Sequence, residues 1–469
     1  MIFSSYSFIF LFLPVVLLGY HLLRRLPNSI WVKGFLTAAS LVFYGLGQRD
    51  YLVMFVLSMA LNYAMAWGIA RWKKQAVRIL LLAAAVVWNI GLLVYFKYTN
   101  FFFEVSNTLL GTHFHFISVI LPIGISFYTF QILSYTIDVF REEAELAKPL
   151  DYFLFVSFFP QLIVGPVVRH NELIPQLEGD RLKTFDTVNI YRGILLFSVG
   201  CAKKIVMANP LIDYAVAFYG GNVAAATTVE AWVGVLAFTL AYYFDFSGYI
   251  DMARGLGYFF GIHLPINFDS PYKATDFADF WRRWNMTISR FFHETIFTNL
   301  FHFGDRIPKL ILATLATFAV SGLWHGADWH YVVWGLVNGV LVCIANIGTV
   351  TRRKLPKWLG LPLTLFLSTL IRVLFDANGM TQAMQVYGRL FSLSGWRNIL
   401  PDLAAFVPQN LVVVLLLVIG AVICLCLPNS NHIGEKTRFT ARDAVWAAVT
   451  FMLALFGMSQ VSTFLYFNF

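Results

Sequence analysis

Residues 51–96 read YLVMFVLSMALNYAMAWGIARWKKQAVRILLLAAAVVWNIGLLVYF, which is two long apolar runs separated by a short basic stretch. A helix needs about 20 mainly apolar residues to cross the hydrocarbon core of a bilayer, and each run approaches that length. The basic residues between the runs are Arg71, Lys73, Lys74 and Arg78. Short loops rich in Lys and Arg are typical of the cytoplasmic side of a membrane. This stretch therefore predicts two transmembrane helices joined by a cytoplasmic loop.

The composition of the whole chain agrees with this prediction. Of its 469 residues, 59% are hydrophobic and 13% are charged, whereas a soluble domain has about 45–50% and about 25%. The composition predicts a polytopic membrane protein and excludes a disordered chain, a secreted protein and a cytosolic enzyme. The net charge of +9 does not indicate a nucleic-acid partner, because the basic residues cluster between apolar runs, where membrane lipid is the expected neighbour.

The other apolar runs predict further helices. They lie at residues 8–23, 30–47, 117–140, 152–168, 194–206, 231–244, 310–323, 331–347, 358–375, 411–427 and 444–467. We therefore expect an all-α fold with about eleven transmembrane helices, and, because no internal repeat or linker is visible, a single domain over residues 1–469.

Basic clusters predict the orientation of the chain. Besides the cluster at residues 71–78, they are Arg24 and Arg25; Arg352, Arg353, Lys354 and Lys357; and Lys436, Arg438 and Arg442. All of them fit the cytoplasmic side if the N-terminus and the C-terminus both lie outside. In a bacterium, both termini would then be periplasmic.

Two central apolar runs are interrupted. The run at residues 152–168 contains Pro160, Gly165 and Pro166. The run at residues 194–206 contains Lys203 and Lys204. Broken or re-entrant helices are therefore expected there. Because irregular backbone is tolerated at membrane depth only inside protein or beside water, the interruptions favour an internal chamber.

The first polar region within the apolar sequence runs from Asp245 to Arg290. Polar groups at membrane depth are costly and usually functional. Asp276 is the expected N-cap of a helix on which Asn285 would share a face with Trp281, Arg282 and Ser289. The alternative is a cytoplasmic amphipathic segment whose arginines, Arg282, Arg283 and Arg290, meet lipid headgroups.

The second polar region is residues 321–330, SGLWHGADWH. The imidazole of His325 suits general-base chemistry, and the small residues Gly322 and Gly326 would allow a close approach. The alternative is a structural histidine at a helix end. A metal site made of His325, Asp328 and His330 is conceivable, but we expect no metal. Motifs for nucleotide binding and for serine hydrolases are absent from the sequence.

The motifs of these regions resemble, in the same order, those of the membrane-bound O-acyltransferase (MBOAT) family. The resemblance is to the bacterial branch that O-acetylates exopolysaccharides such as alginate and cellulose. The motifs are residues 1–5 (MIFSS), 121–131 (LPIGISFYTFQ), 157–162 (SFFPQL), 244–249 (FDFSGY), 267–272 (NFDSPY), 280–284 (FWRRW) and 322–326 (GLWHG).

The resemblance implies particular site residues. The essential histidine of the family corresponds to His325. The second polar catalytic position corresponds to Asn285, where the bacterial polysaccharide branch usually has histidine. Because asparagine cannot take up a proton, Asn285 would orient the substrate or donate hydrogen bonds to a developing oxyanion. The expected substrate-binding or tunnel-lining residues, taken from the same motifs, are Trp281, Arg282, Trp284, Trp324, Asp245, Ser247 and Gln131.

The resemblance also implies a fold and an activity. The expected fold is a ring of helices around a central tunnel in the bacterial inner membrane. The expected enzyme is an O-acetyltransferase that takes acetyl from cytoplasmic acetyl-CoA for a periplasmic exopolysaccharide. An esterase-like periplasmic partner and a polysaccharide synthesis complex would assist it. Two alternatives remain: a lipid or protein O-acyltransferase of the same fold, and a secondary transporter or export channel.

Overall fold

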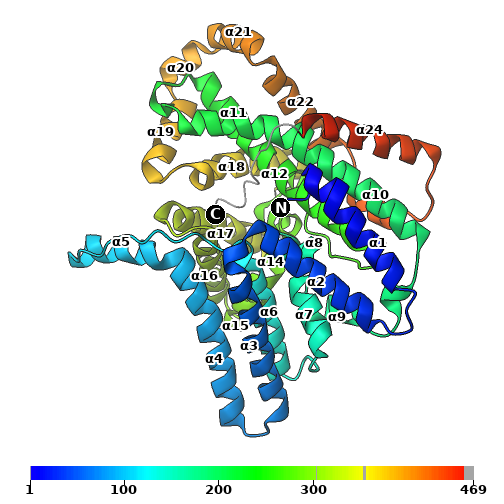
Figure 1. Cartoon of the computed structure of the whole chain (residues 1–469). Helices are drawn as coiled ribbons and strands as arrows, with labels where there is room; N and C mark the ends of the chain where they lie inside the picture. The colour runs from blue at the N-terminus through cyan, green and yellow to red at the C-terminus, as the bar shows by residue number, and fades with distance from the viewer. Residues whose placement is uncertain (1, 303, 352–354, 459–469) are drawn as a thin grey trace. The chain divides into compact units, whose positions relative to one another are not determined.

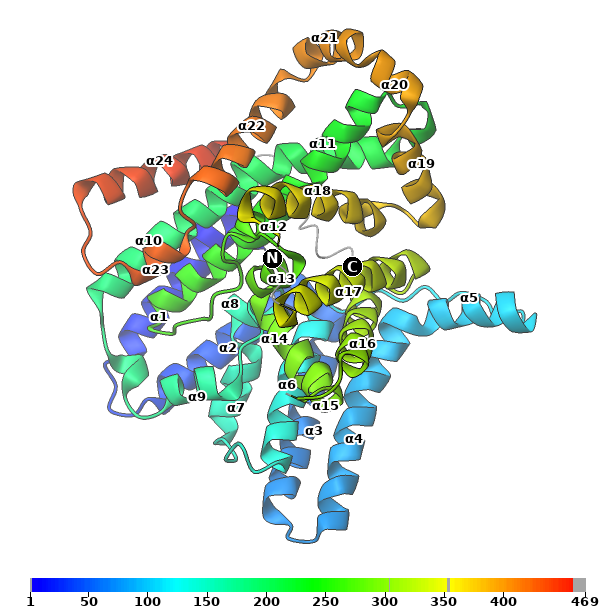
Figure 2. The same ribbon diagram turned by 180° about the vertical axis from the view of Figure 1, so that it is seen from behind.

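The computed structural model describes residues 2–302, 304–351 and 355–458, and every regular element in those ranges is a helix (Figures 1 and 2). The prediction of an all-α membrane protein is confirmed. Some predicted features lie outside the described residues. They are Met1 of the first motif, Arg352, Arg353 and Lys354 of the third basic cluster, and residues 459–467 of the last apolar run.

The chain divides into two compact units that alternate along the sequence. Among the described residues, unit 1 comprises 2–201, 249–265 and 433–458, and unit 2 comprises 202–248 and 266–432. Helix α12 (Thr228–Phe259) contributes residues to both units. The single domain over residues 1–469 stays a prediction.

Unit 1 contains most of the N-terminal helices. Its α-helices are α1 (Leu13–Leu23), α2 (Ile30–Gly47), α3 (Leu52–Arg71), α4 (Gln75–Leu93), α5 (Thr99–Leu110), α6 (Ile125–Phe140), α7 (Pro149–Ser157), α8 (Phe159–Leu162), α9 (His170–Leu177), α10 (Thr187–Ala202) and α24 (Ala441–Gly457). Its shorter helical segments are η1 (Phe8–Phe12), η2 (Arg49–Tyr51), η3 (Val94–Tyr98) and η4 (Arg181–Lys183). The helices α3, α4 and α6 pack side by side, as both views show.

The prediction of a broken helix around Pro160 is confirmed. Helix α7 ends at Ser157, and Pro160 lies in the first turn of the short helix α8. The backbone N–H of Phe159 donates to the Ser40 hydroxyl over 3.0 Å. The carbonyl of Phe155 accepts from Gln161 over 2.7 Å. Side chains thus supply the hydrogen-bond partners that a continuous helix would have provided.

Unit 2 contains the remaining helices. Its α-helices are α11 (Asn209–Gly220), α13 (Phe277–Arg283), α14 (Met286–Phe292), α15 (Thr298–Leu300), α16 (Ile307–His325), α17 (Trp329–Val350), α18 (Lys357–Asp376), α19 (Met380–Leu390), α20 (Leu393–Arg397), α21 (Ile399–Gln409) and α22 (Leu411–Cys426). The shorter segments are η5 (Lys203–Ala208), η6 (Val223–Ala225), η7 (Pro271–Lys273) and η8 (His293–Phe297), while α23 (Asn431–Glu435) begins at the end of this unit.

Eight helical segments within the described residues are long and apolar enough to cross a membrane, and a bent pair, α21 with α22, would make a ninth. The sequence predicted about eleven. The difference lies in runs that form short helices: α6, for example, begins at Ile125 rather than near residue 117 and has 16 residues. Such a helix is about 24 Å long, less than the hydrocarbon thickness of about 30 Å.

The expected interruption at Lys203 and Lys204 is wrong. The chain is helical from Thr187 to Gly220, and the two lysines begin a π-helical turn, η5, within this span. A π-turn accommodates an extra residue without breaking the helix. Lys204 is buried and its ammonium lies 2.5 Å from the Asp245 carboxylate, so an ion pair takes the place of the expected break.

A second buried ion pair joins α2 to α7 in unit 1. The Lys33 ammonium lies 2.5 Å from the Asp151 carboxylate, and the two side chains are 9% and 6% exposed. Removing one member of such a pair leaves the other charge buried without compensation, which typically costs about 3–5 kcal/mol.

We predict that Lys33→Met lowers the thermal stability of the detergent-solubilised protein, because the carboxylate of Asp151 is left without its cation. The double variant Lys33→Met with Asp151→Leu should recover most of the loss, because it leaves no unpaired charge. Thermal unfolding followed by intrinsic fluorescence checks both. Equal melting temperatures for the single variant and the parent would contradict the prediction.

Candidate functional site

His325 is the last residue of α16 and lies at the turn into α17, within unit 2. It is buried, with 7% of its surface exposed. Helix α17 begins directly afterwards, capped by Asp328, whose carboxylate accepts from the His330 N–H over 3.2 Å. The second polar region therefore forms the turn of a helical hairpin, and the buried imidazole is held at that turn.

Two glycines let α16 and α17 approach closely. A Cβ atom on Gly322 would lie 2.3 Å from the Tyr331 carbonyl oxygen, and one on Gly335 would lie 2.3 Å from the Phe318 carbonyl oxygen. Real Cβ atoms do not come so near to backbone oxygen. The spacing of the hairpin that carries His325 therefore depends on glycine at both positions.

Aromatic rings surround the imidazole of His325. The ring centroids of Trp324, Trp334 and Phe375 lie 4.7, 5.0 and 5.0 Å from it, each roughly edge to face. Such contacts fix the plane of a ring. The orientation of His325 is thus set by residues from α16, α17 and α18.

Asn285 lies between α13 and α14, in a left-handed conformation with φ of 44°. Helix α13 begins at the predicted N-cap, Asp276, but ends at Arg283. The prediction that Asn285 shares one helical face with Trp281, Arg282 and Ser289 is therefore wrong. The periodicity of the sequence continues through this point, but the backbone turns there.

Hydrogen bonds orient the buried side chain of Asn285. Its Oδ1 accepts from Asn267 Nδ2 over 3.1 Å, and the Asn267 Oδ1 accepts from the backbone N–H of Thr287 over 3.0 Å. In this arrangement, no group among the described residues accepts a hydrogen bond from Asn285 Nδ2. The amide N–H of Asn285 is therefore available as a donor in this arrangement.

A chain of aromatic contacts connects the segment of Asn285 to that of His325. Trp284 stacks on Tyr242 at 5.9 Å, Tyr242 meets Phe375 at 5.6 Å, and Phe375 meets His325. The two polar regions are 40 residues apart in sequence, and the fold brings their segments into one compact unit.

A small pocket of about 40 Å³ lies beside these rings. Its lining includes two of the expected tunnel-lining residues, Trp281 and Trp284. The other lining residues are Thr239, Tyr272, Phe280, Trp334, Asn338, Ser368, Ile371 and Arg372. Because a water molecule needs about 10–15 Å³ of such space, the pocket has room for about three.

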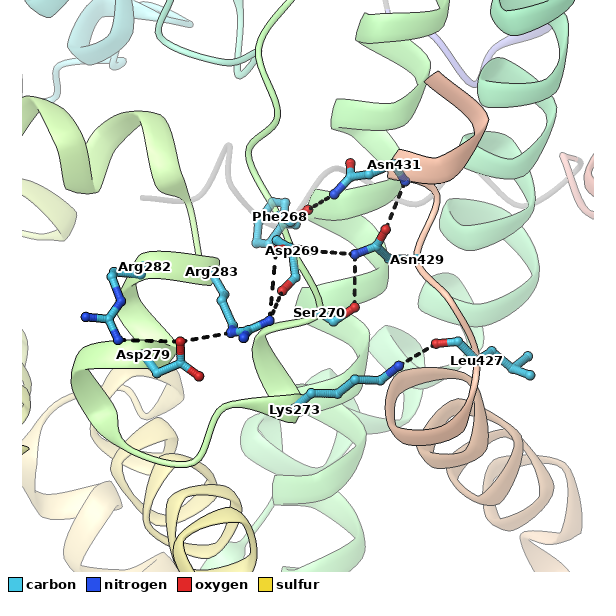
Figure 3. Close-up of polar contacts among 10 residues, drawn as sticks. All are labelled: Phe268, Asp269, Ser270, Lys273, Asp279, Arg282, Arg283, Leu427, Asn429 and Asn431. Carbon is cyan, nitrogen blue, oxygen red and sulfur yellow. Dashed lines mark hydrogen bonds and ion pairs between the residues drawn. The ribbon is translucent and has the colours of Figure 1, made fainter. Parts of the chain in front are cut away.

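Arg282 lies on the surface of unit 2, with 67% of its side chain exposed, and its guanidinium is 3.6 Å from the Asp279 carboxylate. Arg283 pairs more closely with the same carboxylate, at 3.1 Å. Figure 3 shows both arginines beside Asp279 and Arg283 reaching Asp269. Arg282 was predicted to bind substrate or line a tunnel, and its side chain is mostly exposed.

The segment that carries Asn267 is fixed to the residues after α22. Asn429 donates to the Asp269 carboxylate over 2.7 Å and to the Ser270 hydroxyl over 3.0 Å, and Lys273 donates to the Leu427 carbonyl over 2.7 Å (Figure 3). This network fixes the loop from which Asn267 orients Asn285.

Three other predicted residues lie farther from His325 in sequence. Asp245 and Ser247 are buried in α12, each 2% exposed, and Asp245 pairs with Lys204. Gln131 lies in α6 of unit 1, where its amide donates to the Phe155 carbonyl over 2.9 Å.

Three features of this unit were not predicted from the sequence: the role of Asn267, Lys204 as the partner of Asp245, and the pair of Arg372 with Asp376. Arg372 and Asp376 lie at the end of an apolar run, and a charged residue within such a run is the signal that would have found them.

The alternative of a metal site at His325, Asp328 and His330 finds no geometric support. His330 Nδ1 lies 2.9 Å from the Asp328 carboxylate, while the rings of Trp324, Trp334 and Phe375 lie around that of His325. Within residues 2–302, 304–351 and 355–458, no three His, Cys, Asp or Glu side chains cluster in a way that could hold a metal ion.

We predict that Gly322→Ala separates α16 from α17 and lowers the melting temperature, because the new methyl group would meet the carbonyl oxygen of Tyr331. The matched control is Gly388→Ala in α19, where a Cβ atom would contact nothing within 4 Å. Thermal unfolding in detergent compares the two. A loss of stability in the control as large as that in Gly322→Ala would contradict the explanation.

Comparison with known proteins identifies the family of the chain. The model of the membrane-bound O-acyltransferase family matches residues 137–359. The chain is 34% identical to a peptidoglycan O-acetyltransferase of Helicobacter pylori, over 100% of this chain and 98% of the relative. It is 36% identical to a probable alginate O-acetylase of Pseudomonas putida, over 85% of this chain and 81% of the relative.

A more distant relative is a teichoic acid D-alanyltransferase of Bacillus subtilis, 29% identical over 50% of this chain and 62% of the relative. The family match includes both Asn285 and His325. Together with the full-length similarity to the Helicobacter protein, these matches show that the chain belongs to the membrane-bound O-acyltransferase family and is a multi-pass membrane acyltransferase.

Proposed function

We propose that this protein is an O-acetyltransferase of the bacterial cytoplasmic membrane that transfers acetyl from cytoplasmic acetyl-CoA towards a hydroxyl group of a periplasmic polysaccharide. Support for the acetyl group and for the polysaccharide comes from the relatives, which are named for O-acetylation of peptidoglycan and alginate. The acceptor class is thus a cell-surface glycan such as alginate, cellulose or peptidoglycan.

The observation that carries the proposal is the burial of His325 and Asn285 in one compact unit. Both side chains are less than a tenth exposed, and aromatic rings link their segments. Groups excluded from water act more strongly on developing charge than groups in solvent. This arrangement suits acyl transfer between two bound substrates.

The two side chains would have separate roles in the reaction. An imidazole nitrogen of His325 takes the proton of the acceptor hydroxyl as the oxygen attacks the thioester carbon. Negative charge develops on the carbonyl oxygen, where the free amide donor of Asn285 stabilises it. The carbon–sulfur bond then breaks, the thiolate leaves and takes up the proton from His325, and the ester is formed.

We also propose an orientation and a partner. The basic clusters support an orientation in which the loops that contain them lie in the cytoplasm and both termini lie in the periplasm. A periplasmic partner of the esterase-like class would complete the transfer to the polysaccharide, as part of a synthesis complex. That no sugar-binding domain is visible in the sequence is consistent with this division of labour.

We predict that His325→Gln lowers acetyl transfer by about 10²–10⁴-fold, since glutamine fills similar space but cannot act as a base. The assay follows radiolabelled acetyl from acetyl-CoA onto protein, lipid and glycan in vesicles supplied with candidate partners. His115→Gln, at an exposed loop position, is the matched control and should retain activity.

The outcomes of this assay separate the candidate functions. No labelling by the parent would contradict the acetyltransferase and favour a transporter. Label that stays on lipid or on a protein substrate would favour the other O-acyltransferases of the fold. Normal labelling by a folded His325→Gln variant would exclude His325 as the general base.

We predict that Asn285→Ala lowers kcat by about 10²–10³-fold because it removes the donor to the oxyanion. Asn285→His should retain part of the activity, because a ring N–H can donate in the same place. Steady-state rates with acetyl-CoA check both variants. An alanine variant as active as the parent would exclude Asn285 from the mechanism.

A further inference from the structure

A buried ion pair lies at the end of α18, in unit 2. Arg372 Nε lies 3.0 Å from Asp376 Oδ2, and Nη2 lies 2.8 Å from Oδ1. The Asp376 side chain is fully buried, and that of Arg372 is 11% exposed. An ion pair inside an apolar helix carries a high desolvation cost and is weak evidence for stability. A functional role is therefore the hypothesis to examine.

The guanidinium of Arg372 is held in place from two sides. Its Cζ lies 3.6 Å from the ring centroid of Tyr242 and 4.4 Å from that of Phe375. Phe375 is also one of the rings in contact with His325. The cation is thus fixed one side chain away from the proposed base.

Arg372 also lines the small pocket beside Trp281 and Trp284. Most other polar groups of that pocket already donate within the protein. The hydrogen bonds run from Trp281 Nε1 to Asn338 Oδ1, from Asn338 Nδ2 to the Trp334 carbonyl, from Thr239 to the Val235 carbonyl, from Ser368 to the Leu365 carbonyl, and from Tyr272 to the Thr239 carbonyl.

Three donors of the pocket are left over. Within the part of the chain that the structure describes, no protein group accepts from Arg372 Nη1, Trp284 Nε1 or Trp334 Nε1. Guanidinium and indole N–H groups can only donate. The complement to this pocket is therefore an acceptor oxygen, and the space of about 40 Å³ admits only a small part of a ligand.

The charge balance of the pocket narrows the ligand further. The carboxylate of Asp376 already compensates the cation of Arg372, so the pair as a whole is neutral. A neutral acceptor, such as a carbonyl oxygen, fits such a site better than a phosphate or a carboxylate, which would add an uncompensated buried charge.

We propose that this pocket is a subsite that binds the amide carbonyl oxygen nearest the thioester of the donor, while the thioester carbonyl oxygen stays with Asn285; the inference rests on the proposed acetyltransferase function. Arg372 Nη1 is the principal donor, with the Trp284 and Trp334 indoles beside it. Asp376 is a positioning residue that fixes the guanidinium. The subsite binds the donor before and during the reaction alike, and the proton transfer stays with His325.

The test is the double variant Arg372→Met with Asp376→Leu. It replaces the pair by apolar side chains of similar size, so no charge is stranded. Because the lost interaction is present in both the bound donor and the transition state, KM for acetyl-CoA should rise about tenfold or more while kcat changes less than threefold. A purely structural pair would leave KM unchanged in the folded variant, which would overturn the proposal.

Two further variants keep the test decisive if the double variant does not fold. Arg372→Lys retains the positive charge but loses the planar fork, so KM should rise several-fold. The matched control is Tyr387→Phe in α19. It removes a hydrogen bond of 2.9 Å from the Tyr387 hydroxyl to the carbonyl of Leu370, which lies on α18 like Arg372. Tyr387 is not among the residues that line the pocket. An unchanged KM in Arg372→Lys, or a rise of equal size in Tyr387→Phe, contradicts the subsite.

A truncated donor distinguishes the acyl end from the nucleotide. S-acetyl-N-acetylcysteamine keeps the thioester and the amide next to it but lacks the phosphates, and the substitution at Arg372 should raise its KM by the same factor as that of acetyl-CoA. A rise only with acetyl-CoA would mean that Arg372 recognises phosphate, and the proposal would be wrong. If the parent is active and the variants have unchanged KM values, only the subsite is contradicted. If the parent is inactive, the proposed function is contradicted as well.

Discussion

Polar groups that lie away from water must find partners within the protein, and this constraint governs the structure. The short helix α8 exists because side chains from other helices satisfy the backbone around Pro160. The ammonium of Lys204 is buried because Asp245 lies 2.5 Å away. Asn285 is held by Asn267, which is held in turn by the backbone of Thr287. Each of these three polar features thus depends on a partner elsewhere in the fold.

The same constraint explains which features were predictable from the sequence. The helix at residues 30–47 was predicted with its observed limits because its length and apolar content suffice. Asp276 was predicted as an N-cap because the hydrogen bond to Asp279 is local. The broken segment at Pro160 was predicted because proline removes a backbone donor. These features depend on a few neighbouring residues.

Features that depend on distant partners were missed. The turn at Asn285 is stabilised by Asn267, 18 residues earlier, and the periodicity of the surrounding residues gives no sign of it. The continuous helix through Lys204 depends on Asp245, which no local pattern reveals. The contact of His325 with Phe375 joins two helices that are separated by α17. Motif resemblance identified both polar residues, but the geometry around them required the fold.

The left-handed backbone at Asn285 also limits which residues that position can accept. With φ of 44°, most side chains would be strained there, whereas asparagine, aspartate and histidine are among the residues enriched in this conformation. Glycine would also fit but carries no side-chain donor. The histidine usual in the bacterial polysaccharide branch is therefore compatible with the same turn. Exchange between asparagine and histidine during divergence would not require the backbone to be rebuilt, so the chemistry at this position can change while the fold stays the same.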